Sequence, residues 1–121
     1  IKHVYSSALE LAPAQCDVIV DFAGFGQTTA DAIEAVAPGG KVVVVGMGKL
    51  ESTINTRSLI LKQVQVVGSC GGASQDIKDV YGYFATGKLK PKLHAISFDE
   101  IPEGLERLHR GEVKGRLVAV R

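Results

Sequence analysis

Three short apolar runs, each followed by glycine or polar residues, organise the first half of the chain. They lie in residues 16–22, 41–45 and 64–69. The runs are continuous rather than alternating, which is typical of parallel strands that helices cover on both faces. The segments between the runs are long enough for crossover helices. The pattern therefore predicts three buried parallel strands in an α/β fold.

Helix signals fall in the two segments between these strands. Thr28 or Thr29 is predicted to cap a first helix, with Asp31 in the first turn, where the helix dipole favours a negative charge. Asn55 or Thr56 is predicted to cap a short second helix before the third strand. Each helix would lead from the end of one strand to the start of the next.

A third helix has the clearest periodicity in the chain. Ser74 is predicted to cap this helix, and Gly87 is predicted to end it. Its apolar positions recur three and four residues apart, at Ile77, Val80, Tyr81, Phe84 and Ala85. We therefore expect an amphipathic helix with one apolar side.

The chain is predicted to end in a strand, a helix and a strand. The strands are expected around residues 94–98 and 116–120, and the helix between them would open at Asp99 and close at Gly111. A short helical segment is also expected just before Pro13. No repeat or linker interrupts this order.

The predicted three-stranded sheet would leave its outer strands unpaired. An apolar strand such as residues 18–22 makes a poor edge, because unpaired apolar edges invite association. The chain also begins at Ile1, and Met47 is its single methionine. We therefore expect more sheet beside the first strand, in a longer parent protein.

Composition and charge exclude several classes of function. The 121 residues include 14 basic and 13 acidic side chains, and a net charge of +1 without charge runs argues against nucleic-acid binding. No apolar stretch is long enough to span a membrane, so we expect a soluble, cytoplasmic protein. Cys16 and Cys70 are predicted to be small buried hydrophobes rather than metal ligands. His3, His94 and His109 share no metal-ligand spacing and are expected to be structural or solvent-facing.

The loops after the first two strands are the candidate binding rim. Ligands of open parallel sheets bind beyond the carboxyl ends of the strands, which places residues 23–26 and 46–48 there. Residues 24–29 resemble the GxGxxG phosphate fingerprint with threonine in place of the third glycine. The two glycines are also what a tight strand-to-helix turn needs. Asp21 is a candidate for binding an adenosine ribose or, equally, for capping the neighbouring turn.

No nucleophile and base can be paired from spacing in this chain. Its serines lack the GxSxG elbow, and no two carboxylates are placed as an acid and base. From the residues alone, the sequence predicts a ligand-binding part of an α/β domain whose rims offer mainly backbone groups.

An ordered series of motifs identifies a family. VIVDFAG, AVAPGGKVVVVGM, LILKQVQVVGSCGG, YFATGKLKP and FDEIPEGLERLHRGEVKGRLVAV together resemble the C-terminal part of the medium-chain dehydrogenase/reductases, and most of all the zinc-type alcohol dehydrogenases. PGGKVVVVG alone would also suit a methyltransferase. The resemblance implies the second half of a Rossmann-type doubly wound parallel sheet in residues 1–88. A strand-helix-strand return segment to the catalytic domain would follow in residues 89–121.

The resemblance also implies a cofactor site. The first rim would lie near the cofactor ribose groups, the second near the nicotinamide and the third near its carboxamide, while the arginine of a Gly-Arg pair would approach the pyrophosphate. In that order the implied residues are Phe22, Ala23, Gly24, Val45, Gly46, Met47, Ser69, Cys70, Gly71 and Arg116. No residue of this chain is expected to be catalytic or to bind metal.

The implied activity belongs to the parent protein. It is hydride transfer between an alcohol and NAD or NADP, assisted by a zinc ion whose ligands lie upstream, so this chain alone is expected to be inactive. Two alternatives stay open: a zinc-free quinone reductase of the same family, and a non-enzymatic α/β module that pairs with itself. The resemblance further implies a homodimer or tetramer, in which the strand at residues 64–68 pairs with its twin.

Overall fold

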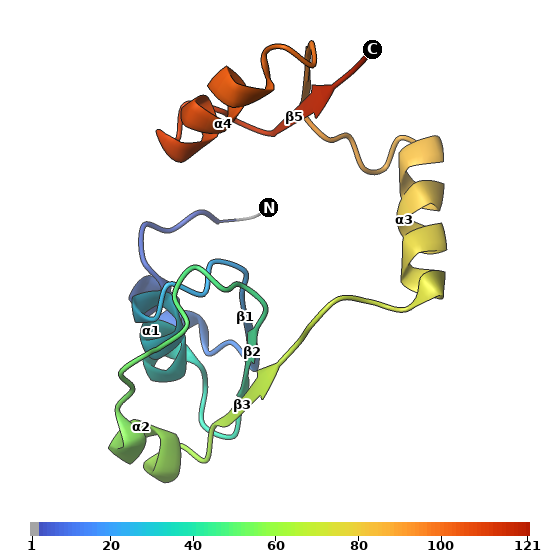
Figure 1. Ribbon diagram of the computed structural model, residues 1–121. Coiled ribbons are helices and arrows are strands. Elements are labelled where there is room, and N and C mark those ends of the chain that lie inside the picture. The colour runs from blue at the N-terminus through green and yellow to red at the C-terminus, as the bar shows by residue number, and fades with distance from the viewer. Residues whose placement is uncertain (1–2) are drawn as a thin grey trace. The chain divides into compact units, whose positions relative to one another are not determined.

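The computed structural model describes residues 3–121 and their helices and strands (Figure 1). The elements are, in order, the 3-10 helix η1 (Ala8–Ala14), β1 (Val18–Asp21), α1 (Gln27–Ala35), β2 (Lys41–Val44), α2 (Thr56–Leu61), β3 (Gln65–Gly68), α3 (Ser74–Ala85), β4 (Leu93–Ile96), α4 (Ile101–His109) and β5 (Arg116–Ala119). They divide into two compact units, of which the first ends at Gly71 and the second begins at Gly72. The predicted boundary at residue 88 stays a prediction.

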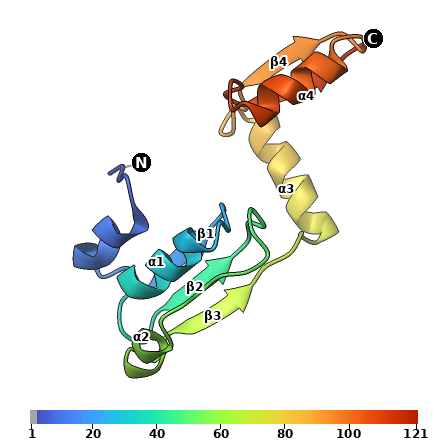
Figure 2. The same cartoon turned by 60° about the vertical axis from the view of Figure 1, so that its left-hand side comes forward.

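The N-terminal unit contains a three-stranded parallel sheet of order β1-β2-β3 (Figure 2). Ile19 pairs with Val42, and Val42 pairs in turn with Val66, so the strands are in step and end at one edge. This confirms the predicted parallel strands, each shorter than its apolar run. The loops that follow the three strands therefore meet at the carboxyl edge of the sheet.

One face of this sheet packs against α1 to form the core of the unit. Ile33 and Val36 are almost completely buried against Val42, and η1 packs on the other side of α1. Along β1 the burial alternates, and Val18 and Val20 remain 55% and 43% exposed. The predicted burial on both faces is therefore wrong within this unit, because its helices cover a single face.

The start of α1 differs from the prediction. Gly26, not a threonine, is the N-cap residue, and the helix begins one residue before Thr28. The Thr28 and Thr29 hydroxyls donate to the Asp21 carboxylate instead of accepting from the helix backbone. Asp31 falls outside the first turn. The buried carboxylate competes successfully for both hydroxyls because it is a stronger acceptor than a neutral group.

Of the caps predicted for the next two helices, one is confirmed and the other is wrong. Asn55 caps α2, as predicted, by accepting hydrogen bonds from the backbone of Arg57 and Ser58. In α3, by contrast, Ser74 is the first helical residue and Ala73 is the N-cap. The Ala73 N–H donates to the Asp76 carboxylate at 2.6 Å, so the acidic side chain three residues on holds this end instead.

The C-terminal unit consists of α3 and a β4-α4-β5 segment. None of the α3 side chains is buried within the unit, and Gly87, with φ of +69°, follows its end as predicted. The strands β4 and β5 pair in parallel, and α4 packs on them with Gly104 as its single buried residue. The predicted start of α4 at Asp99 is wrong by two residues. Glu100 is its N-cap, and Gly111 follows its end as predicted.

The length and hydropathy of the helices bear on whether any of them could span a membrane. Among residues 3–121, no helix is both long enough and apolar enough to cross a bilayer.

Candidate functional site

Two loops at the carboxyl edge of the sheet are joined by their backbones. The Asp21 carbonyl accepts hydrogen bonds from the N–H groups of Val45 and Gly46, at 2.9 and 3.0 Å. The next loop residues continue the pairing, because Lys49 N–H donates to the Gly24 carbonyl at 2.8 Å. The loop after β1 and the loop after β2 therefore form one continuous rim beyond the strands.

The closeness of these loops explains the glycines in both. A side chain on Gly24 would collide with the Gly46 carbonyl, and a side chain on Gly46 would collide with the backbone of Ala23. Gly24 and Gly26 also have positive φ, +60° and +76°, which an L-residue rarely adopts. The interpretation of these glycines as residues of a tight strand-to-helix turn is confirmed.

The Asp21 carboxylate lies behind this turn and holds it. Asp21 is only 6% exposed, and its Oδ1 accepts from the N–H groups of Ala23 and Gly24 at 3.0 and 2.9 Å. Thr28 and Thr29 donate their hydroxyls, the latter to Oδ2 at 2.7 Å. Of the two roles considered for Asp21, the structure shows turn capping.

These hydrogen bonds also set the ionisation of Asp21. Burial alone would raise the pKa of this carboxyl, but the hydrogen bonds from Gly24, Thr29, Thr28 and Ala23 stabilise the charged form. The net effect is a pKa below the ordinary value for aspartate. Asp21 is therefore a carboxylate at neutral pH, and the hydrogen bonds that it accepts come from the turn after β1 and the start of α1.

A hollow of about 520 Å³ opens beside this rim, where β2 and β3 end. Its walls come from the last residues of both strands and the loops that follow: Val44, Val45, Gly46, Met47, Gly68, Ser69, Cys70 and Gly71. The lining is mostly apolar carbon with a fringe of backbone groups. Such a surface suits the flat face of a ring that also carries a few polar atoms.

Some backbone N–H groups at the hollow already donate hydrogen bonds within the protein, and others do not. Val45, Gly46 and Ser69 donate their N–H groups within the sheet and rim, the last to the Val44 carbonyl at 2.9 Å. Among the described residues, the N–H groups of Met47, Cys70 and Gly71 have no partner in the protein. These three groups are therefore available to donate to a ligand.

The structure brings together most of the ten residues that the sequence predicts for a cofactor site. Six of them line the hollow: Val45, Gly46, Met47, Ser69, Cys70 and Gly71. Phe22, Ala23 and Gly24 lie on the adjoining rim, and Phe22 is 77% exposed. Arg116 begins β5 in the C-terminal unit, where its N–H donates to the Lys92 carbonyl. Its predicted contact with a pyrophosphate stays a prediction.

The sequence analysis missed several residues of the site. It did not include Val44 and Gly68, which line the hollow as the last residues of β2 and β3. It also did not connect Thr28 and Thr29 with Asp21. An acidic residue at a strand end, followed by threonines in the first turn of the next helix, is the signal that could have revealed this link.

The cysteines and histidines give a mixed outcome. Cys70 is exposed beside the hollow, so its predicted burial is wrong, and Cys16 is half-buried against the core. His94 contacts the Lys114 carbonyl through Nε2 at 3.0 Å, and His109 is exposed. Among residues 3–121, no group of three or more potential metal ligands lies together. The described part of the chain therefore does not fit a zinc site.

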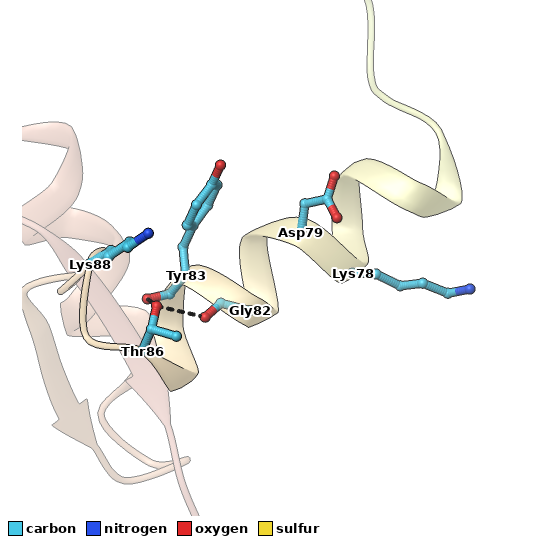
Figure 3. A pocket seen from close by; sticks show the side chains of 6 residues that line it. All are labelled: Lys78, Asp79, Gly82, Tyr83, Thr86 and Lys88. Atoms are coloured by element: carbon cyan, nitrogen blue, oxygen red, sulfur yellow. Dashed lines mark hydrogen bonds between the residues drawn. The ribbon is translucent and has the colours of Figure 1, made fainter.

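A second hollow, of about 310 Å³, lies on the polar side of α3 (Figure 3). Thr86 donates its hydroxyl to the Gly82 carbonyl at 2.9 Å, and the Lys88 ammonium lies 6.0 Å from the ring centre of Tyr83. Both contacts join residues at the C-terminal end of α3 or just after it. They assemble no pair of groups suited to acid-base or nucleophilic chemistry.

Comparison with known proteins identifies the family. Residues 2–86 match the family described as zinc-binding dehydrogenase. The chain belongs to the zinc-binding dehydrogenases. The whole rim and hollow fall inside the matched region, and the resemblance to zinc-type alcohol dehydrogenases stated above is confirmed.

Relatives of this zinc-binding dehydrogenase chain agree in sequence and fold. An alcohol dehydrogenase from Geobacillus stearothermophilus is 33% identical over 87 residues, which are 72% of this chain and 26% of that protein. An acetophenone reductase from Geotrichum candidum, solved with NAD, superposes with a TM-score of 0.81 at 28% identity, over 87% of this chain and 31% of that one. An alcohol dehydrogenase from Aeropyrum pernix gives 0.77 at 30% identity, over 94% and 33%. The chain thus spans about a third or less of these relatives, and its likeness to them confirms the Rossmann-type fold class.

Proposed function

We propose that this chain supplies the nicotinamide side of the cofactor site in an NAD(P)-dependent alcohol dehydrogenase. The observation that carries the proposal is the apolar hollow at the carboxyl ends of β2 and β3, with three unused N–H groups on its border. The relatives named alcohol dehydrogenase, and the reductase solved with NAD, support the same cofactor class.

The residues of the hollow fit a nicotinamide ring. Val44 and Val45 offer an apolar wall for one face of the ring, and the N–H groups of Met47, Cys70 and Gly71 can donate to its carboxamide oxygen or to ribose oxygens. When bound, the cofactor accepts a hydride from an alcohol or returns it to a carbonyl. The chain's own part is to orient the ring and to exclude water from one face.

The proposal includes zinc only because the chain belongs to a family described as zinc-binding dehydrogenase. The described residues do not fit a zinc site, so any zinc ligands would come from elsewhere in the protein that carries this chain. Measuring the metal content of that protein by mass spectrometry separates the two members of the family considered. Zinc bound to the active enzyme supports the alcohol dehydrogenase, and a zinc-free active enzyme supports the quinone reductase.

Cofactor binding by the full-length protein tests the proposal directly. We expect NADH or NADPH to bind with enhanced nicotinamide fluorescence and to raise the melting temperature, because a ligand that binds only the folded state stabilises it. S-adenosylmethionine should have no effect. Stabilisation by S-adenosylmethionine, with none by either nicotinamide cofactor, would instead favour a methyltransferase.

Filling the hollow gives a sharper test of its location. Gly68 lines the hollow, and a Cβ there meets no atom within 4 Å, so Gly68→Leu adds bulk at a position where the first side-chain carbon has room. We expect this variant to fold and to bind NADH at least about 10-fold more weakly, the loss expected for about 1.4 kcal/mol of obstructed contact. Val67→Leu, on the same strand but outside the hollow, is the matched control. Equal affinities for the two variants would place the cofactor elsewhere.

We also infer that the protein pairs through β3. This strand is at one edge of the sheet with all four residues exposed, and Ile60 and Leu61 of the preceding helix are 69% and 66% exposed. Strand pairing with a second copy would cover both features. The choice between dimer and tetramer, and the cytoplasmic location, stay predictions.

A further inference from the structure

The geometry points to Asp21 as a positioning residue for the cofactor rim: we propose that its carboxylate sets the position of the nicotinamide-facing loop without touching the cofactor. This inference deepens the proposed function and rests on it. Asp21 is 6% exposed and lies behind the rim, not in the hollow. Every group that contacts its carboxylate comes from the turn after β1 or the start of α1.

The first step of the argument is how Asp21 controls its own turn. Its Oδ1 accepts from the N–H groups of Ala23 and Gly24, and the peptide group that ends in the Gly24 N–H carries the Ala23 carbonyl, which accepts from the neighbouring loop. The hydroxyl of Thr28 both donates to Asp21 and accepts from the Phe25 N–H at 3.1 Å. Asp21 thus holds two consecutive peptide groups directly, and through Thr28 it holds the next one, which carries the Gly24 carbonyl.

The second step carries this control to the loop after β2. The Ala23 and Gly24 carbonyls accept from the N–H groups of Gly48 and Lys49, at 3.2 and 2.8 Å. Gly46 and Met47, which line the hollow, lie directly before these anchored residues. Since Gly24 and Gly46 are already in close contact, a shift of the first turn must displace the second loop.

The third step excludes a direct role in binding. Four donors occupy the Asp21 carboxylate, two from the backbone and two from hydroxyls, so it has no accessible lone pair for a ribose hydroxyl. Its influence on the cofactor must therefore pass through the rim. Loss of that influence should weaken cofactor binding while leaving the alcohol site and the chemical step nearly intact.

The test compares Asp21→Asn with Asp17→Asn in the full-length protein. Asp17 lies just before the other end of the same strand and is exposed, so its variant controls for the loss of one charge. We expect Asp21→Asn to raise KM for the nicotinamide cofactor about 10-fold, the effect of losing a charge-assisted hydrogen bond. The kcat and the KM for the alcohol should change less than about twofold, a small effect on the free-energy scale of catalysis. Ile33→Val, which weakens the core away from the rim, should leave all three constants unchanged.

Two further measurements keep the proposal falsifiable. If Asp21→Asn does not fold, Thr29→Val removes the 2.7 Å hydroxyl donor, and Thr29→Ser retains it; only the first should raise the cofactor KM. Amide exchange at Gly48 and Lys49 should also quicken in Asp21→Asn but not in Ile33→Val. An unchanged cofactor KM and exchange rate in Asp21→Asn, or an equal loss in Ile33→Val, would overturn the proposal.

The outcome also separates this proposal from the proposed function. If the wild-type protein binds neither NADH nor NADPH, the proposed function fails, and with it the role of the rim in cofactor binding. If the wild type binds a cofactor and Asp21→Asn binds it equally well, only the positioning role fails.

Discussion

At the scale of single residues, two glycines and one carboxylate determine the rim. Gly24 and Gly46 let two backbones come into contact where any side chain would separate them. Asp21 then stabilises the turn by accepting hydrogen bonds from two backbone N–H groups that would otherwise lack a partner. Small changes at these positions should have large effects, because neither backbone can move alone.

Replacing Gly46 with alanine should be severely destabilising. Its Cβ would collide with the Ala23 backbone, and overpacking of this kind costs about 1–3 kcal/mol. Gly68→Ala is the matched control, since its Cβ meets nothing within 4 Å. Urea unfolding of both variants measures the difference. A Gly46→Ala variant as stable as the control would show that the two loops separate easily.

The lowered pKa of Asp21 predicts a specific loss of stability in acid. The pKa of the carboxyl is lower in the folded than in the unfolded protein, so the ionised form stabilises the fold above the unfolded-state pKa. That contribution is lost as the pH falls through the folded-state pKa. We expect the free energy of unfolding of the wild type to fall more steeply below pH 4 than that of Asp21→Asn, about the pH where ordinary aspartates titrate. Parallel pH profiles for the two proteins would contradict this.

At the scale of elements, α1 is the organising helix of the N-terminal unit. One side of α1 packs on β1 and β2, and another side packs on η1. Its last turn is stabilised by a lysine from a later part of the chain. Lys62, after α2, donates its ammonium to the carbonyls of Ile33 and Glu34 at 3.0 and 2.8 Å. A cation at a helix C-terminus satisfies free carbonyls and opposes the negative end of the dipole.

Removing this contact should weaken α1. Lys62→Met keeps the aliphatic chain but loses both hydrogen bonds, and we expect a cost of about 1–2 kcal/mol. Lys41→Met removes an exposed lysine from the start of β2 and should be nearly neutral. Thermal unfolding monitored by circular dichroism compares the two variants. A cost no larger than that of the control would show that solvent replaces Lys62.

At the scale of the whole molecule, apolar surface remains uncovered within each unit. Val18, Val20 and Val67 lie on the sheet face opposite α1 and are 55%, 43% and 39% exposed. In the C-terminal unit, Ile77 and Tyr81 of α3 are 57% and 66% exposed. Contiguous apolar surface of this kind marks places where other protein packs.

The isolated chain of 121 residues should therefore self-associate. We expect its mass, measured by light scattering after gel filtration, to rise with concentration in the micromolar range in which exposed apolar edges and surfaces associate. Combining Val18→Thr with Val20→Thr should reduce the association. Val4→Thr, at an exposed position outside the sheet, should not. A monomer at every concentration would show that these surfaces do not attract one another.

The order of elements was predictable because it depends on short-range patterns. The apolar runs at β1, β2 and β3, the cap at Asn55 and the stop at Gly87 follow from propensity and periodicity within a few residues. The predicted caps at Thr28 or Thr29, at Ser74 and at Asp99 were wrong where a carboxylate elsewhere takes part in the local hydrogen bonding. The Asp21 carboxylate accepts from the Thr28 hydroxyl, and the Asp76 carboxylate accepts from the N-cap N–H of α3. Before α4, the Glu100 carboxylate accepts from the Ser97 N–H, and the helix begins two residues after Asp99.

The sequence by itself thus determined the α/β class, the parallel strands and the family, and nine of the ten candidate residues that it named lie on the rim or in the hollow. Tertiary structure decided which of those positions share a surface, because Met47 and Cys70 come together only when β2 and β3 pair in register. It also decided that Asp21 supports the rim rather than a ligand. That choice depends on donors seven and eight residues away being brought to a buried carboxylate, and only folding makes the carboxylate buried.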